Sequence, residues 1–314
     1  MRGFLLAYLQ VTAGVSASGQ LHNEANCTAL LQAQFESTRG RQSIGVSEDS
    51  VTAQRQSGRG QQSPAPEAQS LSVYVPGSDG TYSQNYQDVW ISSVAQYNGW
   101  TASGGFFLDL GAFHGLKCSN SALVEKTLGW QGVCVEPRPL PGAFLGRTCS
   151  LVQRPLSDTS NKAVALAGSA GSQAQHTVEQ ALAGHQSPGG VMMMTLSMND
   201  LLMCLNSTFE SSVCAGVPRG LQVPLFINFI SLDVEGQDAK VLSTFPFDRI
   251  QVGAWVVEVT DGRNWVSSIL TQNGYMLAPV ENPGVDQYFI QPRFWNPILA
   301  KKLSRVHPPG SEDC

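Results

Sequence analysis

The stretch Phe106-Phe107-Leu108-Asp109-Leu110-Gly111-Ala112-Phe113-His114-Gly115 decides the fold of this chain. An apolar run ends at Asp109 and is followed by a glycine turn, and a second apolar run, Gly132-Val133-Cys134-Val135, ends in Glu136. This order predicts a strand, a turn, a helix and a second strand that ends in a carboxylate. It is typical of the nucleoside-binding half of an α/β fold.

Apolar runs alternate with helical patterns between about residues 76 and 300, which predicts one α/β domain with a mostly parallel sheet and helices on both faces. We expect strands at 105–110, 132–136, 150–153, 226–232 and 254–259. Helices are expected at 119–127 (with Ser119 or Asn120 near the cap), 139–147, 196–205, 237–244 and 263–272. Two further strands, at 274–278 and 287–291, are expected to close the sheet as an antiparallel edge hairpin.

Three segments look different in composition. Residues 18–75 are rich in Gln, Ser, Gly and Ala and have few aliphatics, so we expect a low-complexity linker that cannot offset its ordering entropy by burial. Residues 157–190 read as a flexible insertion within the domain. Residues 301–314 read as a C-terminal tail.

The first 17 residues have the pattern of a secretory signal peptide, with Arg2, an apolar stretch and small residues before a cleavage point. The apolar stretch is too short for a stable membrane span. Sequons at Asn26 and Asn206 fit secretion. We therefore expect a secretory-pathway protein, in the Golgi or endoplasmic reticulum lumen or secreted. A disordered or organellar leader, with a cytoplasmic or organellar protein, is the alternative, favoured by Gln10 and the lack of acidic residues.

Charge and cysteine content exclude some functions. The 314 residues carry a net charge of −5, which gives no basic face for nucleic acid, so a small or neutral partner is expected. Seven cysteines form no zinc-like cluster and no dense disulfide framework, and they do not settle the compartment. Cys134 lies in an apolar strand pattern, where we expect a packed core thiol. No oligomeric state can be predicted.

Carboxylates follow four of the predicted strands. Ligands of open α/β sheets bind beyond the carboxyl ends of the strands. Carboxylates resist burial without partners, so their repeated placement at one edge indicates a site. The residues concerned are Asp109, Glu136, Asp233 with Glu235, and Glu258.

The turn after the first strand has the spacing Gly111-X-X-X-Gly115 rather than that of dinucleotide-binding sites. Closely spaced glycines admit a pyrophosphate, so the wider spacing disfavours a nicotinamide-dependent oxidoreductase. It suits a nucleoside without phosphate, such as S-adenosylmethionine, whose cationic amino-acid end Asp109 could accept. Glu136 could accept hydrogen bonds from both ribose hydroxyls. An ordinary strand–helix–strand unit, with glycines that only pack, is the alternative.

Several motifs in one order resemble the FkbM-type methyltransferase domain over about residues 82–291. They are Tyr82-Ser83-Gln84-Asn85-Tyr86-Gln87-Asp88, Gly105 to Ala112, Ser119-Asn120, Glu125, Leu128-Gly129-Trp130-Gln131-Gly132, Glu136-Pro137, Phe229-Ile230-Ser231-Leu232-Asp233-Val234-Glu235-Gly236 and Gly274-Tyr275. The resemblance implies a Rossmann-like class I fold with a seven-stranded sheet. It also implies S-adenosylmethionine as cofactor and activity mostly as an O-methyltransferase.

The resemblance also assigns roles to residues. Asp109, Gly111, Ala112 and Gly115 would hold the methionine end of the cofactor, and Glu136 its ribose. Gln84, Gln87 and Asp88 would fold over the cofactor, unless they only begin a helix anchored by Trp90. The adenine pocket would lie around 155–158, with Asp158 as the candidate contact.

Transfer of a methyl group to a hydroxyl needs a base. Asp233 and Glu235 are the first candidates, His114 is the rival because its ordinary pKa suits proton transfer near neutrality, and Glu258 could orient the acceptor or pair with Arg263. The acceptor is expected to be a small molecule or a glycan. The main alternative function is a non-catalytic interaction or trafficking module on the same fold.

Overall fold

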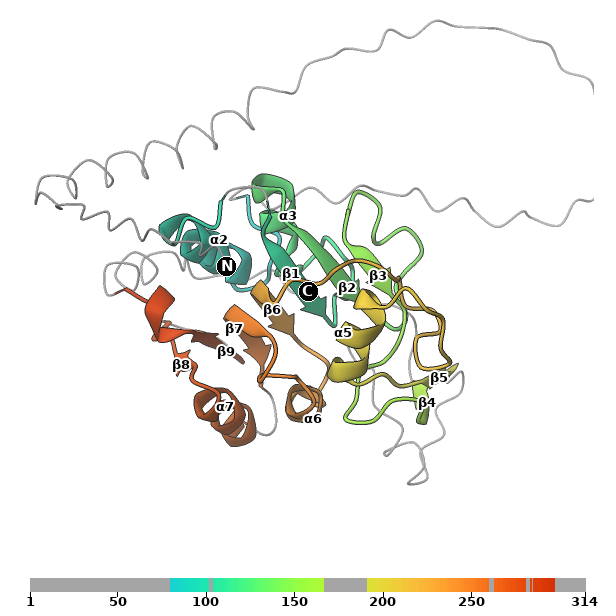
Figure 1. Ribbon diagram of the computed structural model, residues 1–314. Helices are drawn as coiled ribbons and strands as arrows, with labels where there is room; N and C mark the ends of the chain where they lie inside the picture. The colour runs from blue at the N-terminus through green and yellow to red at the C-terminus, as the bar shows by residue number, and fades with distance from the viewer. Residues whose placement is uncertain are drawn as a thin grey trace, which may run out of the picture. The chain divides into compact units, whose positions relative to one another are not determined.

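The computed structural model describes residues 80–101, 104–166, 191–259, 263–280, 283 and 285–296 (Figure 1). The predicted signal peptide, linker and C-terminal tail lie outside these residues, as do residues 167–190 of the predicted insertion and the side chain of Arg263. The boundaries predicted for these segments therefore stay predictions.

A seven-stranded sheet forms the centre of the domain. Its strands, in spatial order, are β3 (Ser150–Val152), β2 (Gln131–Val135), β1 (Phe106–Leu110), β6 (Phe226–Leu232), β7 (Gln251–Glu258), β9 (Asp286–Ile290) and β8 (Met276–Leu277). The first five run parallel, and β9 inserts antiparallel between β7 and β8. This is the Rossmann-like arrangement of class I methyltransferases. The strand order reverses between β1 and β6, where such folds bind their ligands.

Helices cover both faces of the sheet (Figure 1). On one face, α2 (Gln87–Tyr97) and α3 (Ala122–Leu128) pack with Phe107, Cys134 and Phe229. On the other face lie α5 (Met198–Asn206), α6 (Asp238–Ser243) and α7 (Arg263–Gln272), whose apolar residues pack with Leu108 and Ile230. Alternate residues of β1 thus enter opposite cores, as the pleat of a doubly covered strand requires. Asp109 lies on the same face of the strand as Phe107.

Two predicted segments differ from the structure. Residues 139–147 do not form a helix: residues 141–146 form turns, because the nitrogens of Pro139 and Pro141 cannot donate hydrogen bonds and Gly142 and Gly146 adopt positive φ values of 79° and 84°. Part of the predicted flexible insertion is ordered: β4 (Ala163–Leu166) pairs antiparallel with β5 (Val191–Met194).

Two disulfides join described residues. Cys134 of β2 bonds to Cys149, with Cα atoms 5.8 Å apart, and Cys204 of α5 bonds to Cys214, with Cα atoms 5.2 Å apart. The prediction of a free core thiol at Cys134 is therefore wrong. The apolar pattern gave the burial of this side chain correctly, but it contains no information about a partner 15 residues further on.

Candidate functional site

A cavity of about 330 Å³ lies at the carboxyl ends of the central strands, on both sides of the point where the strand order reverses. Its volume is in the range of small-molecule sites. The lining residues come from the loops after β1, β2, β3, β6 and β7, from the segment before and at the start of α2, and from β9. Those with chemical roles are Gln84, Gln87, Asp109, Ala112, Ser119, Glu136, Asp233, Glu235, Glu258 and Asp286.

Glycine is required in the turn after β1. Gly111 has φ +86°, and a Cβ atom there would lie 1.6 Å from the main-chain oxygen of Asp233. Gly115 has φ +77°, and a Cβ atom would lie 2.9 Å from the carbonyl oxygen of Ala143. The N–H groups of Gly111 and Ala112 both donate to the carbonyl of Val135. The turn is therefore held closely between β2 and β6, and Gly111 and Ala112 line the cavity.

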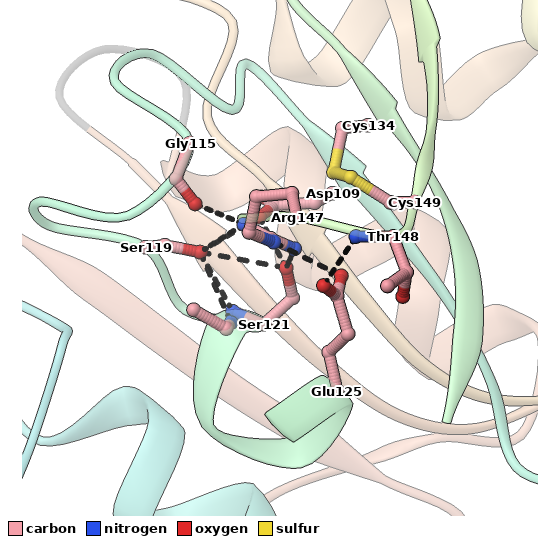
Figure 2. The surroundings of a disulfide bond; sticks show 10 residues. Asp109, Gly115, Ser119, Ser121, Glu125, Cys134, Arg147, Thr148 and Cys149 are labelled. Carbon is pink, nitrogen blue, oxygen red and sulfur yellow. Dashed lines mark hydrogen bonds and ion pairs between the residues drawn. A yellow bond between two sulfur atoms is a disulfide. The ribbon is translucent and has the colours of Figure 1, made fainter. Parts of the chain in front are cut away.

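Asp109 is buried and is held by two serines (Figure 2). The hydroxyls of Ser119 and Ser121 donate to its Oδ2 atom at 3.2 and 2.5 Å. Burial raises the pKa of Asp109, and the charge of Arg147 opposes this shift. Ser119 also accepts from the N–H of Ala122, the first residue of α3, at 3.1 Å. The N-cap of α3 is Ser121, so the helix begins three residues later than predicted, and the Ser121 side chain makes no capping hydrogen bond.

Glu136 follows β2 and is fixed by the backbone. Its Oε2 accepts from the N–H of Phe113 at 3.0 Å, and its Oε1 accepts from the N–H of Arg138 at 2.9 Å. These two main-chain bonds fix the orientation of the Glu136 carboxylate, which lines the cavity. Asp109 and Glu136 thus stand at the ends of paired neighbouring strands, with the Gly111 turn between them.

Three further carboxyls lie in a row along the other half of the cavity. Glu258 is the cross-strand partner of Asp286, and Asp233 directly follows β6, whose Leu232 pairs with Val257. Asp233 is hydrogen-bonded to Glu258, and burial together with the charge of Glu258 raises its pKa well above the ordinary value. Burial is also the main cause that raises the pKa of Asp286 to about 7.

Glu235, the second predicted base, is an exposed residue that lines the same cavity. Burial and the neighbouring charge of Glu258 raise its pKa to about 7. Its φ of +54° is unusual for a residue with a side chain. His114 is not among the residues that line the cavity, and burial lowers its pKa. The structure thus brings together Asp233 and Glu235, but not His114.

The segment before and at the start of α2 supplies one wall through two of the three predicted residues. Gln84 and Gln87 line the cavity, and Gln87 donates to Asp286 at 2.6 Å while its amide oxygen accepts from the N–H of Asn85 at 2.7 Å. Asp88 is buried outside the cavity. It accepts from the hydroxyls of Thr81 and Ser83, each at 2.6 Å, and from the N–H of Tyr82 at 2.7 Å. Asp88 therefore fixes the entry to α2.

The cavity wall at the end of β3 is apolar. It consists of Pro155, Leu156 and Leu166 beside Arg154, whose guanidinium donates to the carbonyls of Met194, Val213 and Thr195. Asp158 is exposed and lies outside the cavity, where it accepts from Ser157 and Thr159. A flat aromatic base would fit such a wall, but Asp158 does not contribute to it.

Sequence reasoning missed Asp286, Arg147 and Arg154. Asp286 follows a segment without strand periodicity, and Arg147 lies in the segment predicted as a helix. A signal for Asp286 did exist, since it is a lone carboxylate that directly precedes the apolar strand 287–291. Within the part of the chain that the structure describes, no group of three or more His, Cys, Asp or Glu residues is arranged to hold a metal ion.

No protein-family model matches the chain, and no curated protein matches it. Among solved structures, the chain is similar to a precorrin-6y C5,15-methyltransferase from Geobacter metallireducens, with 13% sequence identity and a TM-score of 0.32. The match covers 69% of this chain and 92% of that protein. At this level of similarity we draw no conclusion from it, and the methyltransferase fold rests on the strand order and the position of the cavity.

Proposed function

We propose that the protein is an S-adenosylmethionine-dependent methyltransferase of the FkbM type that methylates a hydroxyl group. The observation that carries the proposal is the pair of buried carboxylates, Asp109 and Glu136, at neighbouring strand ends on either side of the Gly111 turn. Both line one cavity at the point where the strand order reverses. The glycine spacing of the turn between them, Gly111-X-X-X-Gly115, is the one expected for a nucleoside without phosphate. The family motifs quoted from the sequence support the finer assignment.

The lining residues fit the three parts of this cofactor. Asp109 and Ser119 would hold its amino-acid end, Glu136 its ribose hydroxyls, and the apolar wall at Pro155, Leu156 and Leu166 its adenine ring. The ligand carries positive charge, and the cavity is lined by several carboxyls. When bound, S-adenosylmethionine supplies an electrophilic methyl group.

The carboxyl row is the part of the site that can take up the proton of the acceptor. Asp233 is hydrogen-bonded to Glu258, and burial together with the charge of Glu258 raises the pKa of Asp233, so Asp233 holds a proton more tightly than an ordinary aspartate. Asp286 and Glu235 have pKa values of about 7, which suit a proton acceptor. Gln87 holds the Asp286 carboxyl in place from α2.

The acceptor that this half of the cavity favours is a neutral molecule with hydroxyl groups, such as a small polyol or a glycan. The amide of Gln84 and the carboxyls of Glu258 and Asp286 line it and are suited to hydrogen bonds with hydroxyls. Arg154 also lines the cavity, and its guanidinium donates to four main-chain carbonyls, those of Met194, Val213, Ala215 and Thr195. An anionic acceptor is therefore disfavoured.

We place this activity in the secretory pathway. The N-terminal pattern supports this location, and so do the two disulfides, Cys134–Cys149 and Cys204–Cys214, because structural disulfides persist in oxidising compartments. None of the helices among the described residues is long and apolar enough to cross a membrane.

Calorimetry with S-adenosylmethionine and S-adenosylhomocysteine tests the proposal. The unmutated protein should bind both, and Glu136→Gln should weaken both because the oriented charge at the ribose position is lost. Asp158→Asn is the matched control, since this carboxyl is exposed and lies outside the cavity. If the unmutated protein binds neither ligand, the methyltransferase assignment is refuted and the interaction module takes its place.

A further inference from the structure

Five buried residues beside the cavity form one polar cluster, which we call the Arg147 network (Figure 2). The guanidinium of Arg147 donates to Ser119 at 3.0 Å, to Ser121 at 2.7 Å and to the carbonyl of Gly115. It also forms an ion pair with Glu125 at 2.9 Å. The members are Asp109, Ser119, Ser121, Glu125 and Arg147.

The charges of the Arg147 network do not cancel. Two carboxylates face one guanidinium, so the network carries one surplus negative charge when both are ionised. The charge of Glu125 is balanced, because Glu125 forms the ion pair with Arg147 and also accepts from the N–H of Thr148 at 2.7 Å. The surplus negative charge therefore lies on Asp109, whose hydrogen-bond partners are the uncharged Ser119 and Ser121.

The surplus charge faces the cavity. Of the five members, only Asp109 and Ser119 line it. Both serines donate to the Oδ2 atom of Asp109. Among the described residues, none donates a hydrogen bond to its Oδ1 atom. A buried, ionised carboxylate with one unused oxygen is stabilised by a cationic ligand group.

We propose that Arg147 is a positioning residue of this site: through Ser119 and Ser121 it keeps Asp109 oriented and ionised for a cationic group of the ligand. The inference rests on the proposed function, in which that group is the ammonium of the cofactor's amino-acid end. Arg147 itself does not line the cavity. Its effect on the ligand is transmitted by the two serines and by its charge.

The electrostatics of Asp109 agree with this role. Burial raises its pKa, the charge of Arg147 lowers it, and the charge of Glu125 raises it. Loss of the guanidinium charge should therefore raise the pKa of Asp109 further. The other charged or titratable groups on the same loop as Asp109 or lining the same cavity are Lys117, His114, Glu136, Arg154, Asp233, Glu235, Glu258 and Asp286.

Two ligands separate this role from a general loss of stability. S-adenosylhomocysteine carries the ammonium, whereas 5′-methylthioadenosine shares its adenosine part and lacks the amino-acid end. We expect Arg147→Gln to weaken binding of S-adenosylhomocysteine by about tenfold, because Ser119 and Ser121 lose the charge-assisted hydrogen bonds from the guanidinium and no longer hold Asp109 in place for the ammonium. Binding of 5′-methylthioadenosine should stay unchanged.

The pH profile gives a second readout. The affinity for S-adenosylhomocysteine should rise with pH as Asp109 ionises, and in Arg147→Gln this rise should move to higher pH. Arg147→Lys keeps the positive charge but loses the guanidinium group that reaches both serines. The midpoint of the rise in affinity with pH should therefore stay near that of the unmutated protein, while the affinity itself falls. Lys126→Gln is the matched control, because Lys126 supports the same segment through the carbonyl of Gly146 without touching the network.

Each outcome decides one point. If the unmutated protein binds neither ligand, the proposed function fails. If it binds both and Arg147→Gln weakens both equally, or neither, the positioning role is wrong. If Arg147→Gln does not fold, Ser121→Ala provides the test, because it removes the 2.5 Å bond to Asp109 and leaves the guanidinium in place. That variant should weaken S-adenosylhomocysteine selectively, and an equal effect on both ligands would overturn the inference.

Discussion

Replacement of Gly111 by alanine should damage both the fold and the ligand site. A Cβ atom at this position would lie 1.6 Å from the main-chain oxygen of Asp233. That oxygen cannot rotate away as the end of a side chain could, and the adjoining N–H of Asp233 is bonded to the carbonyl of Leu110 at 2.9 Å. The segment after β6 must therefore move, and Asp233 must move with it.

The size of the effect can be estimated against a second glycine. Gly129 also has positive φ, at +65°, but a Cβ atom there would meet nothing within 4 Å. Gly129→Ala should cost only the conformational term of about 1–2 kcal/mol. Gly111→Ala should add a steric term of about 1–3 kcal/mol, as in overpacked cores. We therefore expect a total loss of about 2–5 kcal/mol.

Urea unfolding of the two variants measures this difference, and calorimetry with S-adenosylhomocysteine follows the site. Gly129→Ala should be less stable than the unmutated protein but bind normally, whereas Gly111→Ala should lose both stability and affinity. Equal losses of stability in the two variants would show that close approach of the Asp233 carbonyl does not require glycine, and the account of the turn would be wrong.

Three further predictions concern other parts of the chain. Cys134→Ser with Cys149→Ser should lower the free energy of urea unfolding by about 3 kcal/mol, the chain-entropy value for a loop of this length, and a loss below about 0.5 kcal/mol would contradict it. Asp286 has a pKa of about 7 in the folded protein, so the folded state binds its proton more tightly than the unfolded state does. The free energy of unfolding should therefore fall as pH rises from about 4 to 7, and Asp286→Asn should make this fall less steep in a series of urea unfolding curves at different pH. An unchanged slope in the variant would show that Asp286 does not titrate in this range. Asn206, exposed at the end of α5, should carry an N-glycan after secretory expression, which Asn206→Gln should remove from the mass spectrum while stability changes by less than about 0.5 kcal/mol; identical masses for the two proteins would refute the assignment.

Strands buried on both faces were the easiest elements to predict. The predicted bounds 226–232 coincide with β6, and 263–272 coincide with α7, because a continuous apolar run and a helical period are local signals. The helix predicted at 139–147 does not form, because two prolines and two positive-φ glycines outweigh its apolar spacing. The correct and the incorrect predictions thus both depend on residues within the segment itself.

The residues around the cavity could be predicted only where they stand at the end of an apolar strand in the sequence. Asp109 lies near the end of β1 and Glu136 directly follows β2, and the parallel pairing of these strands brings both to one edge of the sheet. Asp286 was missed because its importance depends on Gln87, which lies 199 residues away, and no local pattern encodes such a pair. Asp88 belongs to one of the family motifs, but its carboxylate accepts hydrogen bonds from the hydroxyls of Thr81 and Ser83 instead of facing the cavity. A motif gives the residue type, whereas only packing decides which way the residue faces.

The bond between Gln87 and Asp286 links the first described helix to one of the last two strands of the sheet. On the ribosome, the side chain of Gln87 emerges long before that of Asp286, and β9 must insert between β7 and β8 before the two can meet. The cavity is therefore completed only after β9 has been synthesised and inserted into the sheet. A chain that stops before β9 could form most of the sheet, yet it would lack one wall of the cavity, so ligand binding reports whether β9 has been inserted.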